Sequence, residues 1–289
     1  MELNFNVKNS KLLKDGAKIC NFIAQLCDVR AKKSYGQHFL KDEALSRDIA
    51  MAIRSHNTYD VLLEVGPGRG ALTQYLTEAK KPFYAVEADG DMVNYLIEKE
   101  ILKEEQILFK NFLKIDFKDH FASKKIGLVG NFPYNISSQI VFKMLDNTEQ
   151  IPVMVGMFQK EMAQRILSPP GSKDYSVISV FAQLFYSGRL LFDVPPASFS
   201  PPPKVNSAVI ILERNQRNAL PCNYSTFKTV VKLCFGQRRK MLRNTLKGMV
   251  ADKLFFDDPF FKRRPEHVSI EEFITLTCKI EAISNSLDH

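Results

Sequence analysis

The chain has 289 residues, of which 45% are hydrophobic and 25% are charged, a composition typical of a soluble globular protein with one large core and a small companion domain. No run of 18 or more residues is apolar, and the N-terminus lacks the pattern of a secretory signal, so we expect a cytoplasmic protein without a membrane span. The five cysteines form no C-x-x-C pair, which argues against a disulfide framework or a zinc site, and the net charge of +8 favours an anionic partner, above all nucleic acid.

The first expected segment is formed by residues 1–30. Lysines are spread along it, and Ile19, Ile23 and Leu26 have loosely helical spacing. We interpret this segment as a basic N-terminal extension or an extra helix.

Short apolar runs and amphipathic stretches alternate between residues 42 and 167. The pattern predicts strands at 61–63, 83–86, 107–109, 126–129 and 153–158. It predicts helices at 42–54, through Leu72 and Leu76, at 91–100 and at 161–167. Because this alternation is typical of βαβ units, we expect an α/β fold with a parallel sheet covered by helices on both faces.

The pattern changes after Tyr186. Two further strands flank a proline-rich loop at 195–203, and from residue 215 onward strands give way to helical spacing. We therefore expect a boundary within residues 213–220, with an α/β domain at 31–214 and a small all-helical domain at 215–289.

The stretch EVGPGRGALT places Gly66, Gly68 and Gly70 between a predicted strand and a predicted helix. Glycine lets the backbone turn tightly there and lets a ligand approach more closely than any Cβ would allow. Glu87 ends the next strand, 21 residues after Gly66, where a carboxylate suits the two hydroxyls of a ribose. The combination predicts an adenosine-containing cofactor, but it does not separate S-adenosylmethionine from NAD, because Ala71 completes the dinucleotide pattern G-x-G-x-x-[G/A].

Asn131-Phe132-Pro133-Tyr134 follows the fourth predicted strand, at the edge where open α/β sheets bind ligands. The exocyclic amine of adenine is a poor nucleophile, because its lone pair is delocalised into the ring. The side-chain oxygen of Asn131 and a backbone carbonyl beside Pro133 could accept its hydrogens and free the lone pair for in-line attack. Pro133 restricts the backbone around that carbonyl, so a methyl transfer to adenine at this site would require no strong base.

An adenine inside a duplex could not reach these groups, so the target must be unpaired or flipped out and held by aromatic faces. Tyr134 is one candidate for this stacking, and Phe199 in the stretch ASFSPPPKVNS is a second wall. Structural alternatives remain for both, because Asn-x-Pro is common in turns and Phe199 could be a core residue.

Residues 228–247 contain seven Lys or Arg and no Asp or Glu. If the stretch is helical, Arg239, Lys240, Arg243 and Lys247 share one face, which could bind RNA phosphates without reading sequence. A solvated helix face is the alternative, although the absence of acidic partners favours RNA. Cations after the fifth strand could extend the surface. The predicted RNA-binding residues are Lys160, Arg165, Arg238, Arg239, Lys240 and Arg243.

Five blocks of the sequence, spread in order over residues 32–212, resemble one known family. They read KSYGQHFL, EVGPGRGALT, GNFPYNISSQI, QKEMAQRI and FSPPPKVNSAV. They look like the signature blocks of the KsgA/Dim-type rRNA adenine N6,N6-dimethyltransferases. The resemblance implies a Rossmann-like class I methyltransferase sheet with a small C-terminal helical domain, and S-adenosylmethionine as the cofactor.

The resemblance also implies roles for single residues. His38, where the family often has Asn, and Leu40 would line the cofactor site. Gly66 would contact the methionine portion, Glu87 the ribose, and Asn131 both the cofactor and the target amine, while Tyr134 and Phe199 would sandwich the adenine. Asn111 stands where the family usually has an Asp that accepts a hydrogen bond from the cofactor's adenine amine, and Asp116 is an alternative acceptor.

The leading hypothesis is S-adenosylmethionine-dependent dimethylation of two adjacent adenosines in the 3′-terminal hairpin loop of small-subunit (16S) rRNA, linked to ribosome biogenesis. We expect a monomer without a metal, acting on rRNA or an immature small subunit. One rival is a large-subunit rRNA methyltransferase of the macrolide-resistance type, which more often differs at the position of Phe132. The others are a non-catalytic ribosome-assembly protein that binds RNA, and an NAD dehydrogenase, which lacks a His or Lys placed for hydride chemistry.

Overall fold

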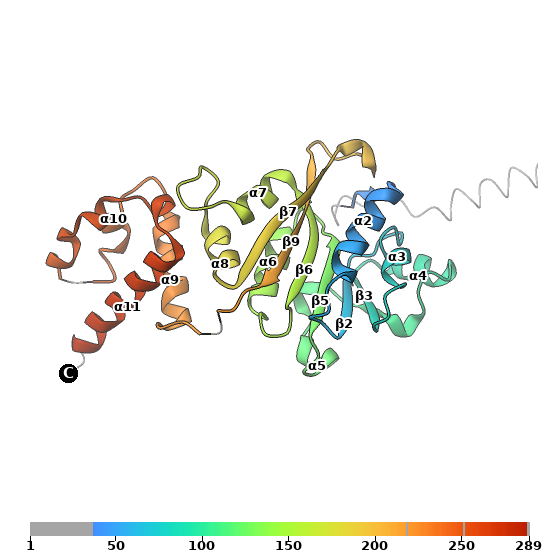
Figure 1. Cartoon of the computed structure of the whole chain (residues 1–289), viewed down its shortest axis with the longest axis horizontal. Coiled ribbons are helices and arrows are strands. Elements are labelled where there is room, and N and C mark those ends of the chain that lie inside the picture. Colours follow the sequence, from blue (N-terminus) through green and yellow to red (C-terminus); the bar gives the residue numbers. More distant parts are fainter. Residues whose placement is uncertain (1–36, 218, 251, 288–289) are drawn as a thin grey trace, which may run out of the picture.

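The computed structural model describes residues 37–217, 219–250 and 252–287, so the predicted extension at residues 1–30 lies outside the described residues. Its centre is a seven-stranded sheet in the order β4-β3-β2-β5-β6-β9-β7 (Figure 1). The strands are β2 (Val61–Val65), β3 (Phe83–Glu87), β4 (Ile107–Phe109), β5 (Ile126–Asn131), β6 (Val153–Gln159), β7 (Tyr186–Val194) and β9 (Ser207–Arg214). β2 to β6 are parallel, whereas β9 pairs antiparallel with β6 and β7. The expected α/β fold is confirmed, but the sheet is mixed because β9, between β6 and β7, runs antiparallel to both.

Helices cover both faces of the sheet, as consecutive strand residues point to opposite sides. Leu62 packs with Ile49 and Ile53 of α2 (Glu43–Arg54), whereas Leu63 belongs to the core on the other face. The face with α2 also carries α3 (Thr73–Leu76) and α4 (Gly90–Glu98). The other face carries α5 (Phe117–Phe121), α6 (Ser137–Leu145), α7 (Lys160–Leu167) and α8 (Val177–Phe185).

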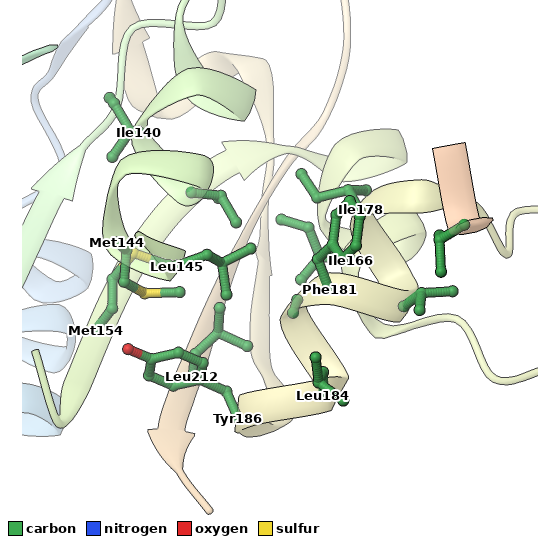
Figure 2. Packing of buried hydrophobic residues seen from close by; sticks show 14 of the residues in the cluster. Ile140, Met144, Leu145, Met154, Ile166, Ile178, Phe181, Leu184, Tyr186 and Leu212 are labelled. Carbon is green, nitrogen blue, oxygen red and sulfur yellow. The ribbon is translucent and has the colours of Figure 1, made fainter. Parts of the chain in front are cut away.

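The core beneath α6, α7 and α8 is built mainly of aliphatic and aromatic side chains (Figure 2). Met144 and Leu145 of α6 and Phe181 of α8 point into it. Tyr186 is 1% exposed and donates its hydroxyl to the carbonyl of Ile151 over 2.7 Å. Burial of these side chains contributes about 1.5–3 kcal/mol each, so this layer fixes the sheet from which the strand ends emerge.

Helices α9 (Tyr224–Gly236), α10 (Leu242–Leu246) and α11 (Ile270–Leu287) lie at one end of the molecule, beyond α8 (Figure 1). Asn223 caps α9 by accepting hydrogen bonds from the backbone of Ser225 and Thr226. The ring of Phe227 lies 6.2 Å from that of Phe181, and both belong to one continuous core. The last strand, β9, ends at Arg214, next to the predicted domain boundary. Because the core continues across this position, the division into two domains stays a prediction.

Candidate active site

A cavity of about 290 Å³ opens at the carboxyl ends of β2, β3 and β5 and beside the segment after β4. The chain runs outward from β2 through β3 to β4 on one side and from β5 to β6 on the other, so the cavity lies at the switch point where open α/β sheets bind ligands. Besides the glycine loop, it brings together most of the residues predicted for the site, and Phe132 with them. These are His38, Leu40, Gly66, Glu87, Asn111, Asn131, Phe132, Pro133 and Tyr134.

The glycine loop after β2 forms one wall of the cavity. Gly66 has φ +69°, and a Cβ there would meet only Cδ of Pro133, at 4.0 Å, so a side chain would project into the open cavity. Gly70, at φ +80°, instead lies against Ile101, whose Cγ2 would be 2.9 Å from a Cβ. Gly66 thus leaves space for a ligand, while Gly70 permits packing.

Glu87, at the tip of β3, is 6% exposed and turned toward the glycine loop. Its Oε1 accepts hydrogen bonds from the backbone N–H of Ala88 (2.8 Å) and Asp89 (2.9 Å), and its Oε2 accepts a longer one from Gly68 (3.4 Å). Burial raises the pKa of this carboxyl, and the three backbone donors oppose the rise. A carboxylate has about four acceptor positions, so Glu87 keeps capacity for ribose hydroxyls.

Glu64 of β2 is a cavity residue that the sequence interpretation missed. It is 1% exposed, and its Oε2 accepts a hydrogen bond from the hydroxyl of Thr73 over 2.7 Å. Burial raises its pKa to about 8; the bond from Thr73 lowers it and the charge of Glu87 raises it. A carboxylate inside the apolar strand sequence VLLEV was the available signal, since unpaired carboxylates are rarely buried.

Phe132 anchors the Asn-Phe-Pro-Tyr segment to the sheet. Gly130 of β5 and Gly156 of β6 are register partners, and the Phe132 ring occupies the space that their missing side chains leave. The ring is 1% exposed and lies edge-on to Phe158 at 5.1 Å, while its backbone N–H donates to the carbonyl of Met157 over 3.2 Å. The packing of the Phe132 ring therefore sets the direction in which Asn131 and Pro133 leave the sheet.

Asn131 is oriented by the backbone of the neighbouring segment. Its Nδ2 donates to the carbonyl of His38 over 2.9 Å, which leaves Oδ1 as the acceptor for a ligand. The carbonyl of Pro133 already accepts from the N–H of Ile136 at 3.1 Å, but no described residue donates to the carbonyl of Phe132. Asn131 Oδ1 and the Phe132 carbonyl are therefore two available acceptors at the end of β5.

Tyr134 is held at both its hydroxyl and its ring. The hydroxyl lies 2.5 Å from Oγ of the buried Ser207, and burial raises the pKa of the phenol, which is therefore neutral at neutral pH. The His38 ring stacks on it with centroids 5.4 Å apart and planes at 27°. Nδ1 of His38 donates to the carbonyl of Pro201 over 2.8 Å, so His38 connects Tyr134 to the proline-rich loop.

Phe199 does not reach the cavity wall. It lies in β8 (Phe199–Ser200), which pairs antiparallel with β1 (Phe39–Leu40), and its register partner is Leu40. The Phe199 ring is 1% exposed and belongs to the core on the α2 face of the sheet. The structure places it as the core residue considered as the alternative, because β1–β8 pairing turns it inward.

Of the two predicted acceptors for a cofactor's adenine amine, only Asn111 lines the cavity. Its Oδ1 accepts a hydrogen bond from the N–H of Leu113 over 2.9 Å and has one further lone pair. Asp116 instead caps α5 by accepting from the N–H of Lys118 at 2.8 Å.

The predicted RNA-binding cations divide into two groups. Lys160 pairs with Asp193 (2.6 Å), Arg165 with Glu161 (2.7 Å), and Arg238 with Glu266 (2.9 Å). Arg239, Lys240 and Arg243 are exposed and form no ion pair with any described residue. They do not lie on one helix, as the spacing had suggested: α9 ends at Gly236, and the first two lie in the turn before α10.

Within the described part of the chain, no group of three or more His, Cys, Asp or Glu residues could hold a metal ion. In the same ranges, no helix is long and apolar enough to span a bilayer.

Comparison with known proteins identifies close relatives of the chain. The sequence model of the family described as "Ribosomal RNA adenine dimethylase" matches residues 29–257. Two relatives named "Ribosomal RNA small subunit methyltransferase A", from Porphyromonas gingivalis and Flavobacterium johnsoniae, are 47% and 48% identical over 255 residues. These cover 88% of this chain in both cases, and 98% and 97% of the respective relatives.

Two solved structures share the fold at lower identity. A dimethyladenosine transferase from Plasmodium falciparum has a TM-score of 0.69 and 24% identity, covering 86% of this chain and 98% of its own. The 23S rRNA methyltransferase ErmE has a TM-score of 0.63 and 21% identity, covering 84% of this chain and 99% of its own. These two likenesses support the methyltransferase fold.

Proposed function

Because this chain belongs to the ribosomal RNA adenine dimethylase family, we propose that it dimethylates N6 of two adjacent adenosines in the 3′-terminal hairpin loop of small-subunit rRNA. The names of the relatives that share nearly half of its residues favour the small subunit over the large one. The observation that carries the proposal is the pair of available acceptors at the end of β5, Asn131 Oδ1 and the carbonyl of Phe132.

The cofactor in this proposal is S-adenosylmethionine, and the residues of the cavity fit it. Gly66 leaves open space where any larger residue would place a Cβ, which suits the methionine portion. Glu87 offers buried acceptors to the ribose, Asn111 offers one to the adenine amine, and His38 and Leu40 complete the wall. When bound, the cofactor supplies a methyl group made electrophilic by a positive sulfur.

Asn131 and Phe132 would act on the target amine through hydrogen bonds. Each oxygen accepts one of the two N6 hydrogens, which draws the nitrogen toward tetrahedral geometry and localises its lone pair. Both acceptors are fixed before the substrate arrives, Asn131 by the carbonyl of His38 and Phe132 by its ring between Gly130 and Gly156. The contribution is positioning and electrostatics, and no covalent nucleophile is required.

Tyr134 would carry the target base on its ring. One base–aromatic stack contributes about 1–3 kcal/mol, and the bonds of Tyr134 to Ser207 and its contact with His38 hold the ring in place beforehand. Phe199 contributes from the core, by supporting β1 through Leu40.

Arg239, Lys240 and Arg243, which pair with no acidic residue in the described ranges, would supply most of the phosphate contacts. Lys160, Arg165 and Arg238 could add to them only by exchanging a carboxylate partner for a phosphate. We propose a monomeric cytoplasmic enzyme whose substrate is the immature small subunit and which uses no metal.

Methyl-labelled S-adenosylmethionine, mixed with separated immature small and large subunits, tests the proposal. We expect dimethyladenosine in small-subunit rRNA only, and at least a hundredfold less, as an order-of-magnitude estimate, with Asn131→Ala. Label in the large subunit would support the macrolide-resistance type of enzyme, and RNA binding without any methylated product would support an assembly protein.

A further inference from the structure

Glu64 is an ionisable group inside the cavity for which the proposed transfer has no use. The carboxyl is 1% exposed, Thr73 Oγ1 donates to its Oε2 over 2.7 Å, and no described residue donates to its Oε1. Glu64 nevertheless lines the cavity, two residues before the open Gly66.

Among the described residues, no cation forms an ion pair with Glu64. Glu87 on the adjacent strand repels a negative charge there, and Asp89, 2% exposed, follows it at the start of α4. The basic groups of the cavity are engaged elsewhere: the Arg69 guanidinium lies 4.7 Å from the ring centroid of Phe39, and Lys110 Nζ lies 3.1 Å from Nε2 of His120. His38, which also lines the cavity, uses its Nδ1 to donate a hydrogen bond to the carbonyl of Pro201.

Burial without a cation favours the neutral carboxylic acid, which agrees with a pKa of about 8 for Glu64. A cation placed in the cavity reverses this preference, because opposite charges in a low dielectric favour ionisation. The methyl donor carries a net charge of +1, whereas its product after transfer, a thioether, carries none.

We propose that Glu64 senses the charge of the ligand in the cavity: it is protonated in the free protein, loses its proton to solvent when the cationic donor binds, and regains one when the neutral product remains. This inference rests on the proposed function, since it assumes that the donor is a sulfonium. On ionisation the O–H bond breaks, the proton passes to buffer, and the carboxylate balances the donor's charge. Glu64 thereby favours the donor over the product and assists product release.

Isothermal titration calorimetry at pH 7, in buffers of different ionisation enthalpy, counts the protons released on binding, with no RNA present. We expect about 0.8 proton per donor bound and less than about half of that for the thioether product S-adenosylhomocysteine. Glu64→Gln keeps an oxygen for Thr73 and should abolish the release. It should also lower the ratio of donor affinity to product affinity by about tenfold, the equivalent of one pKa unit.

Thr73→Val serves as the second variant, because it removes the hydrogen bond to Glu64 and leaves the carboxyl in place. Proton release on donor binding should persist in this variant. Because the lost hydrogen bond had lowered the pKa of Glu64, the pH range of the release should move upward relative to the unsubstituted protein. Three results would overturn the role of Glu64 without affecting the proposed function. They are equal proton release with donor and product, donor binding without proton release, and unchanged proton release in Glu64→Gln. A chain that does not bind the donor at all would overturn the proposed function together with this inference.

Discussion

Gly156→Ala tests whether the packing of Phe132 positions the catalytic segment. A Cβ at residue 156 would lie 2.7 Å from Cε2 of Phe158 and still closer to the ring of Phe132, nearer than real Cβ contacts allow. Both rings are fully buried, so neither can swing into solvent. The Phe132 ring must shift and carry the backbone beside it, and with that backbone the two acceptors of the proposed site.

Two costs follow from that shift. Overpacking of a core by one methyl typically lowers the free energy of unfolding by about 1–3 kcal/mol. A displacement of reacting groups by about 1 Å can lower the rate about a hundredfold, so we expect methyl transfer to fall by at least about tenfold. Urea denaturation measures the first quantity, and labelled methyl transfer under saturating conditions, where the variant is folded, measures the second.

Gly127→Ala is the matched control. It lies in the same strand as Gly130, and its Cβ would press on the Tyr59 ring at 2.8 Å, far along β5 from Asn131. It should destabilise the protein to a similar extent and leave methyl transfer within about twofold. If Gly156→Ala lost stability as the control does but kept full activity, the argument that Phe132 positions Asn131 would be refuted.

Three further outcomes are expected. The pKa of Glu64 is raised from 4.5 to about 8, so the folded chain keeps a proton that the unfolded chain releases, and the free energy of unfolding falls by up to about 5 kcal/mol as the pH rises between these values. Glu64→Gln should abolish this fall in urea denaturation at pH 5 and pH 9, and an unchanged pH dependence would contradict it. Replacing Arg239, Lys240 and Arg243 by Gln should reduce the slope of log K against log salt for small-subunit RNA by about 2–3, whereas an unchanged slope would show that they contact no phosphate. Tyr134→Phe should lower the free energy of unfolding by about 1–3 kcal/mol, because the Ser207 hydroxyl loses its partner. It should keep kcat within about tenfold, because the ring that stacks on the base is retained. A fall in kcat as large as that of Tyr134→Ala would count against stacking by the ring.

Local patterns in the sequence were sufficient for most of the sheet. The apolar runs beginning at Val61, Phe83 and Ile126 form the buried strands β2, β3 and β5. A short apolar run is a local signal of a buried strand and can be read without knowing the neighbouring strands. The direction of β9 could not be read in this way. Its insertion between β6 and β7 depends on pairing between residues some fifty positions apart, such as Gln159 with Ser207.

The same limit applies to the site. Asn131 and Glu87 were predictable because each ends a strand whose carboxyl end must face the cavity. The sequence left Phe199 open between the cavity and the core, and its burial in the core depends on pairing with Leu40, far away in the chain. The ion pair of Lys160 could not be predicted from local sequence, because its partner Asp193 lies 33 residues further along the chain.

The core shared by α8 and α9 has a consequence for substrate choice. Because Phe227 packs against Phe181 within one continuous core, apolar contacts join the helical end of the molecule to the sheet. If the exposed cations near α10 bind phosphates as proposed, this packing would hold them at a set distance from the acceptors at the end of β5. A nucleotide would then reach Asn131 only if the RNA between it and the bound phosphates had the matching length, so the enzyme could select its target by distance as well as by base identity.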